Sequence, residues 1–116
     1  MLKIKRFGLI GRNIDYSFSR QYFSKKFKKQ NLTDHEYVNC DIEDIKDFKK
    51  IKSKDFNGFN VTTPYKEKII NFLDIVDGSA KEIGAVNTIK IKKGKLIGYN
   101  TDYIGFLKTI DGFNFT

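Results

Sequence analysis

Apolar residues in the first half of the chain alternate between short continuous runs and helical repeats. Residues 6–11, RFGLIG, form an apolar run that ends in glycine, which predicts a buried strand followed by a loop. In residues 20–30, RQYFSKKFKKQ, aromatic side chains recur at helical spacing, and Ser19 is placed to cap that helix. A second strand is predicted at 35–41, and apolar residues three apart over 42–51 indicate a second amphipathic helix.

The same alternation continues in the middle of the chain. Residues 56–61, FNGFNV, predict a third strand. Pro64 fits the first position of a following helix, with Thr63 as its cap and an apolar face that extends to Leu73. A short helical segment is predicted at 79–84.

The C-terminal part predicts a hairpin and a last helix. Residues 85–100 read as two strands joined through Lys93-Gly94, and a helix begins after them with Asp102 as its predicted cap. Strands that alternate with helices indicate an α/β protein. We therefore predict a three-layer sandwich with a mixed, mainly parallel sheet that includes the C-terminal hairpin.

Composition narrows the class of protein. The chain has 116 residues, of which 40% are hydrophobic, enough for one domain with a real core. Its net charge of +8 is compatible with nucleic acid, but the lysines are spread along the chain, and a solvated lysine-rich face explains them better. The single cysteine, Cys40, excludes an intramolecular disulfide and a cysteine-cluster metal site. No apolar stretch suits a signal peptide or a membrane span, so we expect a cytoplasmic protein without membrane or nucleic-acid partners.

Lys66 stands out because the pattern places it in the first turn of the helix that follows Pro64. The helix macrodipole makes that end partly positive, so an ammonium group is destabilised there. Lys66 is therefore either an ordinary surface lysine beside Glu67 or a residue that performs chemistry.

Polar residues gather at the ends of the predicted strands or in the loops just after them. They are Ser17, Ser19, Asn60, Thr62, Lys66, Asn87, Asn100, Thr101 and Asp102. Ligands of open α/β sheets bind beyond the carboxyl ends of strands, and these groups suit a small polyhydroxylated acid. Lys66 and Asp102 could shuttle a proton to or from an oxygen of such a substrate. Each residue alone could equally be a cap, a turn residue or a surface charge.

The polar residues lie in four short motifs that resemble those of the shikimate dehydrogenases, specifically their N-terminal substrate-binding domain. The family's serine pair resembles YSFS here, and its other motifs appear as NVTTPYK, GAVNT and GYNTD. All four motifs occur in the family's order and cover Ile10 to Phe106.

The resemblance implies a role for all of these polar residues except Asn100. Ser17 and Ser19 would hold the carboxylate of shikimate. Residues around the ring hydroxyls would be Asn60, Thr62, Asn87 and Asp102, with Thr101 completing the wall. Lys66 and Asp102 would form the catalytic pair at the alcohol that is oxidised. The implied reaction is the reversible NADPH-dependent reduction of 3-dehydroshikimate to shikimate in aromatic amino-acid biosynthesis.

Two departures from the family pattern follow. Arg20 stands where the family usually has proline after the second serine. The family's C-terminal Rossmann domain for NADP, and the last helices that return to the substrate domain, have no counterpart here, and none of the nine glycines forms a Gly-x-Gly pair. We expect residues 1–110 to be the catalytic substrate-binding domain and 111–116 to begin the linker to a missing cofactor domain. Such a chain would bind no NADP(H) and would be inactive alone.

Several alternatives stay open at this point. A quinate/shikimate dehydrogenase paralogue would differ in substrate breadth and in accepting NAD, and a non-catalytic binding module could share the fold. We expect a monomer or a weak homodimer.

Overall fold

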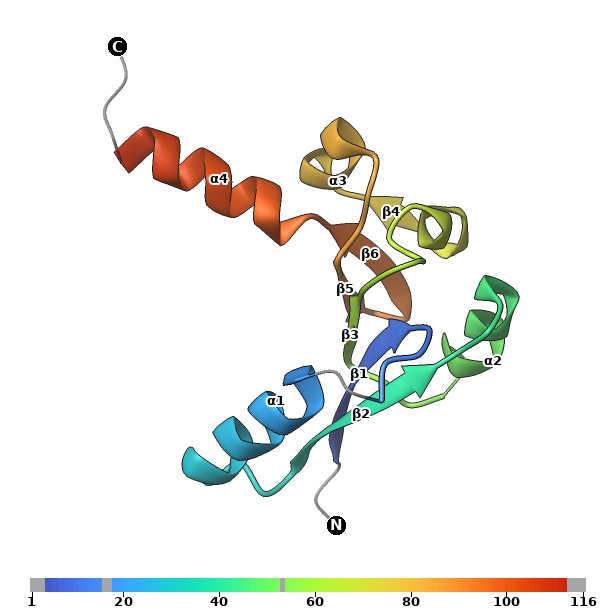
Figure 1. Ribbon diagram of the computed structural model, residues 1–116, viewed down its shortest axis with the longest axis vertical. Helices are drawn as coiled ribbons and strands as arrows, with labels where there is room; N and C mark the ends of the chain where they lie inside the picture. The colour runs from blue at the N-terminus through green and yellow to red at the C-terminus, as the bar shows by residue number, and fades with distance from the viewer. Residues whose placement is uncertain (1–3, 16–17, 53, 113–116) are drawn as a thin grey trace.

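The structure of the protein is a computed structural model that describes residues 4–15, 18–52 and 54–112. Its strands form a single six-stranded sheet in the order β2-β1-β3-β5-β6-β4 (Figure 1). The strands are β1 (Lys5–Gly11), β2 (His35–Asp41), β3 (Gly58–Val61), β4 (Ile75–Val76), β5 (Thr88–Lys92) and β6 (Lys95–Tyr99). The α-helices are α1 (Phe18–Lys29), α2 (Phe48–Lys52), α3 (Gly78–Ile83) and α4 (Thr101–Gly112), with 3-10 helices η1 (Ile45–Asp47) and η2 (Lys68–Phe72).

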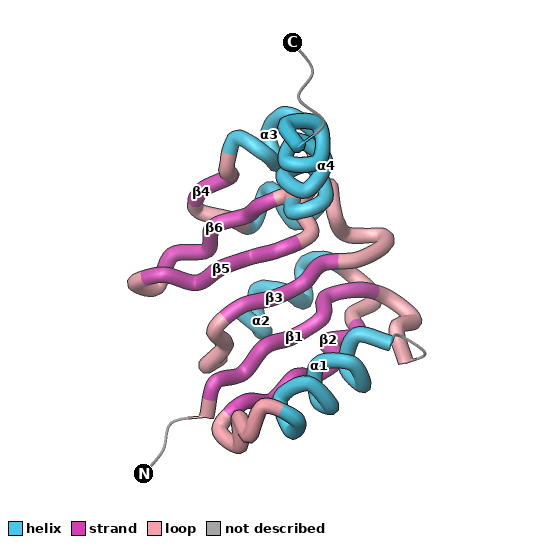
Figure 2. The backbone as a smooth tube through the Cα atoms, turned by 90° about the vertical axis from the view of Figure 1, so that its left-hand side faces the viewer, coloured by secondary structure: helices cyan, strands magenta, loops and turns pink. Residues whose placement is uncertain are grey.

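The sheet is mixed and mainly parallel. β1 pairs in parallel with β2 and with β3, and β4 pairs in parallel with β6. β5 is antiparallel to both of its neighbours. Helices lie on both faces of the sheet, with α1 and α2 on opposite sides (Figure 2). The predicted fold class is therefore confirmed.

One face of the sheet, called here the α1 face, is covered by α1 over β1 and β2. Phe27 of this helix packs against Phe7 of β1 at 6.1 Å between ring centroids, and the ring of Phe23 stacks on Tyr37 of β2 at 4.8 Å. Aromatic side chains at positions i and i+4 lie on one side of a helix, so the aromatic spacing in the sequence produces this contact.

The opposite face carries the larger core. Ile10, Phe59 and Ile89 alternate with the residues of the α1 face along their strands, as the two-residue period of a strand requires. Phe48 of α2 and Ile69 of η2 cover them and are fully buried. This core fixes the relative positions of the strands whose ends carry the polar motifs.

The predicted hairpin is confirmed. β5 and β6 pair in antiparallel register around Lys93 and Gly94. Both turn residues have positive φ, 50° and 76°, which is the backbone of a tight type I′ turn. Glycine tolerates this conformation without a steric penalty.

The helix predicted after β3 is wrong in its position. Residues 63–64 and 66–67 form turns, the Thr63–Pro64 peptide is cis, and the 3-10 helix η2 starts only at Lys68. The carbonyl of Lys66 accepts a hydrogen bond from the amide of Val86 at 2.8 Å, and the Ile70 amide donates to the Glu67 carbonyl at 3.3 Å instead of to Lys66. Lys66 therefore does not lie in the first turn of a helix, and the macrodipole argument does not apply to it.

Two predicted caps are also wrong. α1 begins at Phe18, so Ser19 lies inside its first turn. α4 begins at Thr101, and the side-chain oxygen of Asn100 accepts the Tyr103 amide at 2.9 Å. Asn100 therefore caps α4, and Asp102 lies in the first turn.

The remaining differences concern short elements. The helix predicted over 42–51 is shorter, because the Asp44 side chain accepts the Lys46 amide and starts η1, which continues into α2. β4, which has only two residues, was not predicted. Within the described residues, no helix is both long and apolar enough to cross a bilayer.

Candidate functional site

Two backbone hydrogen bonds bring the middle motifs together at one edge of the sheet. The Val86 amide donates to the Lys66 carbonyl at 2.8 Å, and the Val61 amide donates to the Asn87 carbonyl at 2.8 Å. In the register, Asn60 of β3 lies opposite Thr88 of β5. The segments around Asn60, Lys66 and Asn87 are therefore neighbours, although they are far apart in the sequence.

The Asn87 side chain extends this connection to α4. Its Oδ1 accepts hydrogen bonds from the Thr101 amide at 3.0 Å and from the Thr101 hydroxyl at 3.2 Å. It also accepts the Thr88 hydroxyl at 3.1 Å. Asn87 therefore connects the start of α4 to the segment that pairs with Lys66 through Val86. Asp102 follows Thr101 directly, so this connection also fixes where Asp102 lies.

The side chain of Asn60 is positioned by a residue of β2, Tyr37. Its Oδ1 accepts a hydrogen bond from the Tyr37 hydroxyl at 2.9 Å. Tyr37 in turn interacts with the side chain of Ser19, near the start of α1. Burial raises the pKa of Tyr37 to about 12, and the hydrogen bond from Ser19 opposes that rise. The tyrosine therefore remains a neutral donor at physiological pH.

Thr62 lies just after β3 and is partly buried. Its amide donates to the Ile10 carbonyl at 2.8 Å, and its carbonyl accepts the Tyr65 amide at 3.0 Å. A Cβ added at Gly11 would lie only 2.6 Å from the Thr62 Cγ2. Glycine at the end of β1 therefore leaves the space that the Thr62 side chain occupies.

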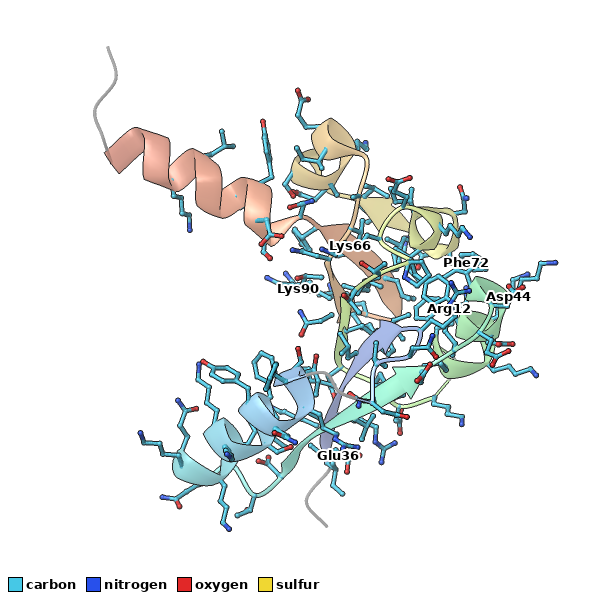
Figure 3. All side chains as sticks on the ribbon, in the orientation of Figure 1. Arg12, Glu36, Asp44, Lys66, Phe72 and Lys90 are labelled. Carbon is cyan, nitrogen blue, oxygen red and sulfur yellow. The ribbon has the colours of Figure 1, made fainter. Side chains whose placement is uncertain are left out.

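Lys66 and Asp102 lie at the two ends of this hydrogen-bond network. The Lys66 carbonyl accepts the Val86 amide, and Asp102 follows Thr101, which donates to Asn87. Lys66 is partly exposed, and Asp102 is exposed in the first turn of α4. In Figure 3, Lys66 and Lys90 lie in the part of the view between α1 and α4. Ser17, the other predicted carboxylate residue, lies outside the described residues.

Sequence reasoning missed two structural members of the site. The sequence predicts Tyr37 only as part of a strand, although its side chain connects Ser19 with Asn60. Asn100, which is 7% exposed, was grouped with the ligand residues but caps α4 and donates to the Ala85 carbonyl at 3.1 Å. Asparagine is among the preferred N-cap residues, and this preference is the signal in the sequence that could have identified Asn100 as the cap.

An apolar cavity of about 410 Å³ lies on the α1 face beside this network. Phe7, Phe23 and Phe27 line it, and Asn60 and Thr88 reach its wall. Neither Lys66 nor Asp102 lines it. The polar site and the cavity therefore share the Asn60 edge and are otherwise distinct.

Two other kinds of site, a reactive cysteine and a metal site, have little support in the structure. Burial raises the pKa of the Cys40 thiol to about 11, which disfavours the reactive thiolate. In the described ranges, no three His, Cys, Asp or Glu side chains come together in a way that could hold a metal ion.

An open mixed sheet with hydroxyl, amide, amine and carboxylate groups beyond its strand ends defines the class of small-molecule binding α/β domains. The comparison with known families is specific. A profile described as the shikimate dehydrogenase substrate binding domain matches residues 9–89. The chain belongs to this family, and the resemblance inferred from the four motifs is confirmed.

Individual relatives agree. The chain is 45% identical over 109 residues to a shikimate dehydrogenase (NADP(+)) of Clostridium botulinum, covering 92% of this chain and 42% of the relative. Shikimate dehydrogenase 1 from Peptoclostridium difficile superposes with a TM-score of 0.80 at 40% identity, over 96% of this chain and 43% of that one.

A structure of shikimate 5-dehydrogenase from Thermus thermophilus in complex with shikimate also superposes on the chain. The TM-score is 0.80 at 30% identity, over 97% of this chain and 44% of that one. The chain thus spans less than half the length of the relatives that it matches.

Proposed function

We propose that the chain is the substrate-binding and catalytic domain of an NADP-dependent shikimate dehydrogenase, with residues 1–110 as the domain and 111–116 as the start of a linker. The observation that carries the proposal is the hydrogen-bonded connection from Lys66 through Val86 and Asn87 to Thr101. It joins three of the four family motifs at one edge of the sheet. A structure of a relative in complex with shikimate gives further support.

The polar side chains would contact different groups of the substrate. Ser17 and Ser19 would donate hydroxyl hydrogen bonds to the carboxylate of shikimate, and Ser19 would turn its single proton from the Tyr37 hydroxyl to the ligand to do so. Asn60, Thr62 and Asn87 would contact the ring hydroxyls, and the exposed carboxylate of Asp102 would accept from one of them. A neutral ligand with the same ring would lose the interaction with the serine pair.

Lys66 and Asp102 would act on the oxygen that changes between ketone and alcohol. In the reducing direction, the ammonium of Lys66 would donate a hydrogen bond to the ketone oxygen and would supply or relay the proton of the new hydroxyl. Once the oxygen is a hydroxyl group, as in shikimate, Asp102 would orient it by accepting its hydrogen bond. The positive charge of Lys66 would stabilise the negative charge that develops on the oxygen during hydride transfer.

NADPH would supply the hydride when it is bound. All described strands of this chain belong to the one six-stranded sheet, and no Gly-x-Gly pair is present. The residues that hold the cofactor would therefore lie outside these 116 residues, and the chain would not catalyse the reaction alone. We further propose that it acts in the cytoplasm as a monomer or weak homodimer, without membrane or nucleic-acid partners.

Titration of the chain with shikimate, followed by NMR of its backbone amides, tests the proposal. We expect binding in the millimolar range, because the rest of the enzyme would form the other wall of the site. Lys66→Ala should weaken the affinity about tenfold, the loss expected for a hydrogen bond from a charged group.

The matched control is Lys68→Ala, which removes an exposed lysine two residues away that belongs to none of the motifs. It should leave the affinity unchanged. The proposal is wrong if millimolar shikimate leaves the spectrum of the folded chain unchanged, or if both lysine variants weaken binding equally.

A further inference from the structure

Tyr37 lies between the two parts of the proposed site without belonging to any of the four motifs. It stands on β2 opposite Phe7 of β1, on the α1 face, and is 5% exposed. Its ring stacks on Phe23 with an interplanar angle of 20°. The ring is therefore fixed by packing, and the direction of its hydroxyl group is fixed with it.

The hydroxyl group determines how Asn60 presents its amide. A side-chain amide has one oxygen that accepts and one nitrogen that donates two hydrogen bonds. The Oδ1 of Asn60 accepts the Tyr37 hydroxyl at 2.9 Å. The Nδ2 is consequently the end of the amide that remains for a ligand, and it can only donate.

Asn87 is oriented in the same sense by different partners. Its Oδ1 accepts three hydrogen bonds, two from Thr101 and one from Thr88. Both amides of the site therefore turn their oxygens toward protein donors. A ligand at this edge meets amide donors from β3 and from the segment before β5, so its own oxygens must act as acceptors there.

We propose that Tyr37 is a positioning residue for shikimate: it holds the Asn60 amide with its nitrogen toward the ligand and, through Ser19, links the carboxylate end of the site to the ring-hydroxyl end. The inference rests on the proposed function, because it assigns Asn60 and Ser19 to the same ligand. Groups that fix the orientation of a contacting residue commonly determine how well that residue binds.

A double-mutant cycle on shikimate affinity tests this role. Tyr37→Phe keeps the stacked ring and removes the hydroxyl, and we expect it to weaken binding about five- to tenfold, as for one lost hydrogen bond. In an Asn60→Ala background the same change should cost less than twofold, because its effect passes through Asn60. Tyr22→Phe, which removes an exposed tyrosine hydroxyl from α1, is the matched control and should change nothing.

A second measurement needs no ligand. The side-chain NH2 signals of Asn60 should shift in Tyr37→Phe and stay unchanged in Tyr22→Phe, whereas a purely structural role would not move them selectively. Signals that stay in place overturn the positioning role even if the fold is intact.

The outcomes separate this inference from the proposed function. If the wild-type chain binds shikimate and the effects of Tyr37→Phe and Asn60→Ala simply add, the positioning role is wrong and the proposed function stands. If the wild-type chain does not bind shikimate, the proposed function is wrong, and the role of Tyr37 in binding fails with it.

Discussion

At the scale of single residues, the buried ionisable groups set a pH limit on stability. Desolvation raises the pKa of Tyr37 from 10.0 to about 12 and that of Cys40 from 9.0 to about 11. Desolvation also raises the pKa of Tyr65, whose hydroxyl donates to the Ile42 carbonyl at 2.5 Å. Each of these groups is neutral in the folded protein and ionises more easily in the unfolded chain.

The free energy of unfolding should therefore fall as the pH rises. Below pH 10 both states hold the Tyr37 proton, and its contribution is fully present. Between pH 10 and about 12 the unfolded chain releases this proton while the folded protein keeps it, so the unfolded state binds fewer protons and stability is lost. The loss from Tyr37 should be about 2–3 kcal/mol.

Urea unfolding at several pH values measures this effect. Tyr37→Phe removes the group, so its stability should fall less steeply above pH 10, although Cys40 still contributes in both proteins. Equal slopes for the wild-type chain and the variant would contradict the burial argument.

The residue scale also shows which parts of the site were predictable. Asn60, Lys66, Asn87 and Asp102 could be selected because polar side chains at strand ends carry a signal in the sequence. Tyr37 could not, because an aromatic residue in a strand indicates only a buried face. Its partners depend on how β2 and β3 lie around β1, which no local pattern encodes.

At the scale of elements, α4 presents the catalytic candidate Asp102, and its start is fixed by Asn100. The Asn100 side chain accepts the Tyr103 amide and donates to the Ala85 carbonyl. Its backbone amide donates to the Ser79 hydroxyl at 3.0 Å. The cap therefore joins α4 to the start of α3 and to the segment before Asn87.

Asn100→Ala should lower the free energy of unfolding by about 1–2 kcal/mol, since it removes a helix cap and a hydrogen bond from a buried group. Asp102→Asn should cost less than about 1 kcal/mol, because Asp102 only interacts with the helix dipole. Chemical denaturation compares the two. A larger loss for Asp102→Asn would restore Asp102 as the cap.

β6 depends on a close approach at Gly98. A Cβ added there would lie 2.5 Å from the Leu73 Cδ1 and 2.8 Å from the Val86 Cγ2. Gly98→Ala should therefore destabilise the protein by about 1–3 kcal/mol, as overpacked cores do. It should also disturb the Val86 amide that binds Lys66, and thermal unfolding with amide NMR can measure both effects.

The matched control is Gly105→Ala in α4, where an added Cβ meets no atom of the described residues within 4 Å, the backbone of its own helix and its two chain neighbours apart. Alanine is the better helix former, so this variant should be more stable by about 0.5–1 kcal/mol. Equal effects of the two glycine variants would show that β6 tolerates a side chain at this position.

The elements were predictable to different degrees for identifiable reasons. β1, β2, β3 and the hairpin follow from apolar runs and turn residues. The helix after β3 does not form where Pro64 and Thr63 indicate; there the backbone of Lys66 pairs with Val86 from a distant segment, and the Ile70 amide donates to Glu67. Long-range contacts of this kind override local propensity.

At the scale of the whole molecule, the sheet order explains why distant motifs meet. β3 is central, with β1 on one side and β5 on the other, so the motifs after β3, before β5 and after β6 converge at one edge. The alternation of strands and helices in the sequence predicts an α/β fold, and in folds of this class the polar residues at strand ends are expected to converge. The contacts that create it, such as the one from Thr101 to Asn87, are visible only in the structure.

The most direct test of the whole account is a crystal structure of the chain with shikimate at saturating concentration. We predict that the Lys66 Nζ and the Asp102 carboxylate lie within hydrogen-bond distance of the oxygen of one hydroxyl group on the ring, with Asn60 and Asn87 donating to the neighbouring hydroxyl oxygens. Shikimate bound elsewhere, or Lys66 and Asp102 directed to opposite sides of the molecule, would contradict it.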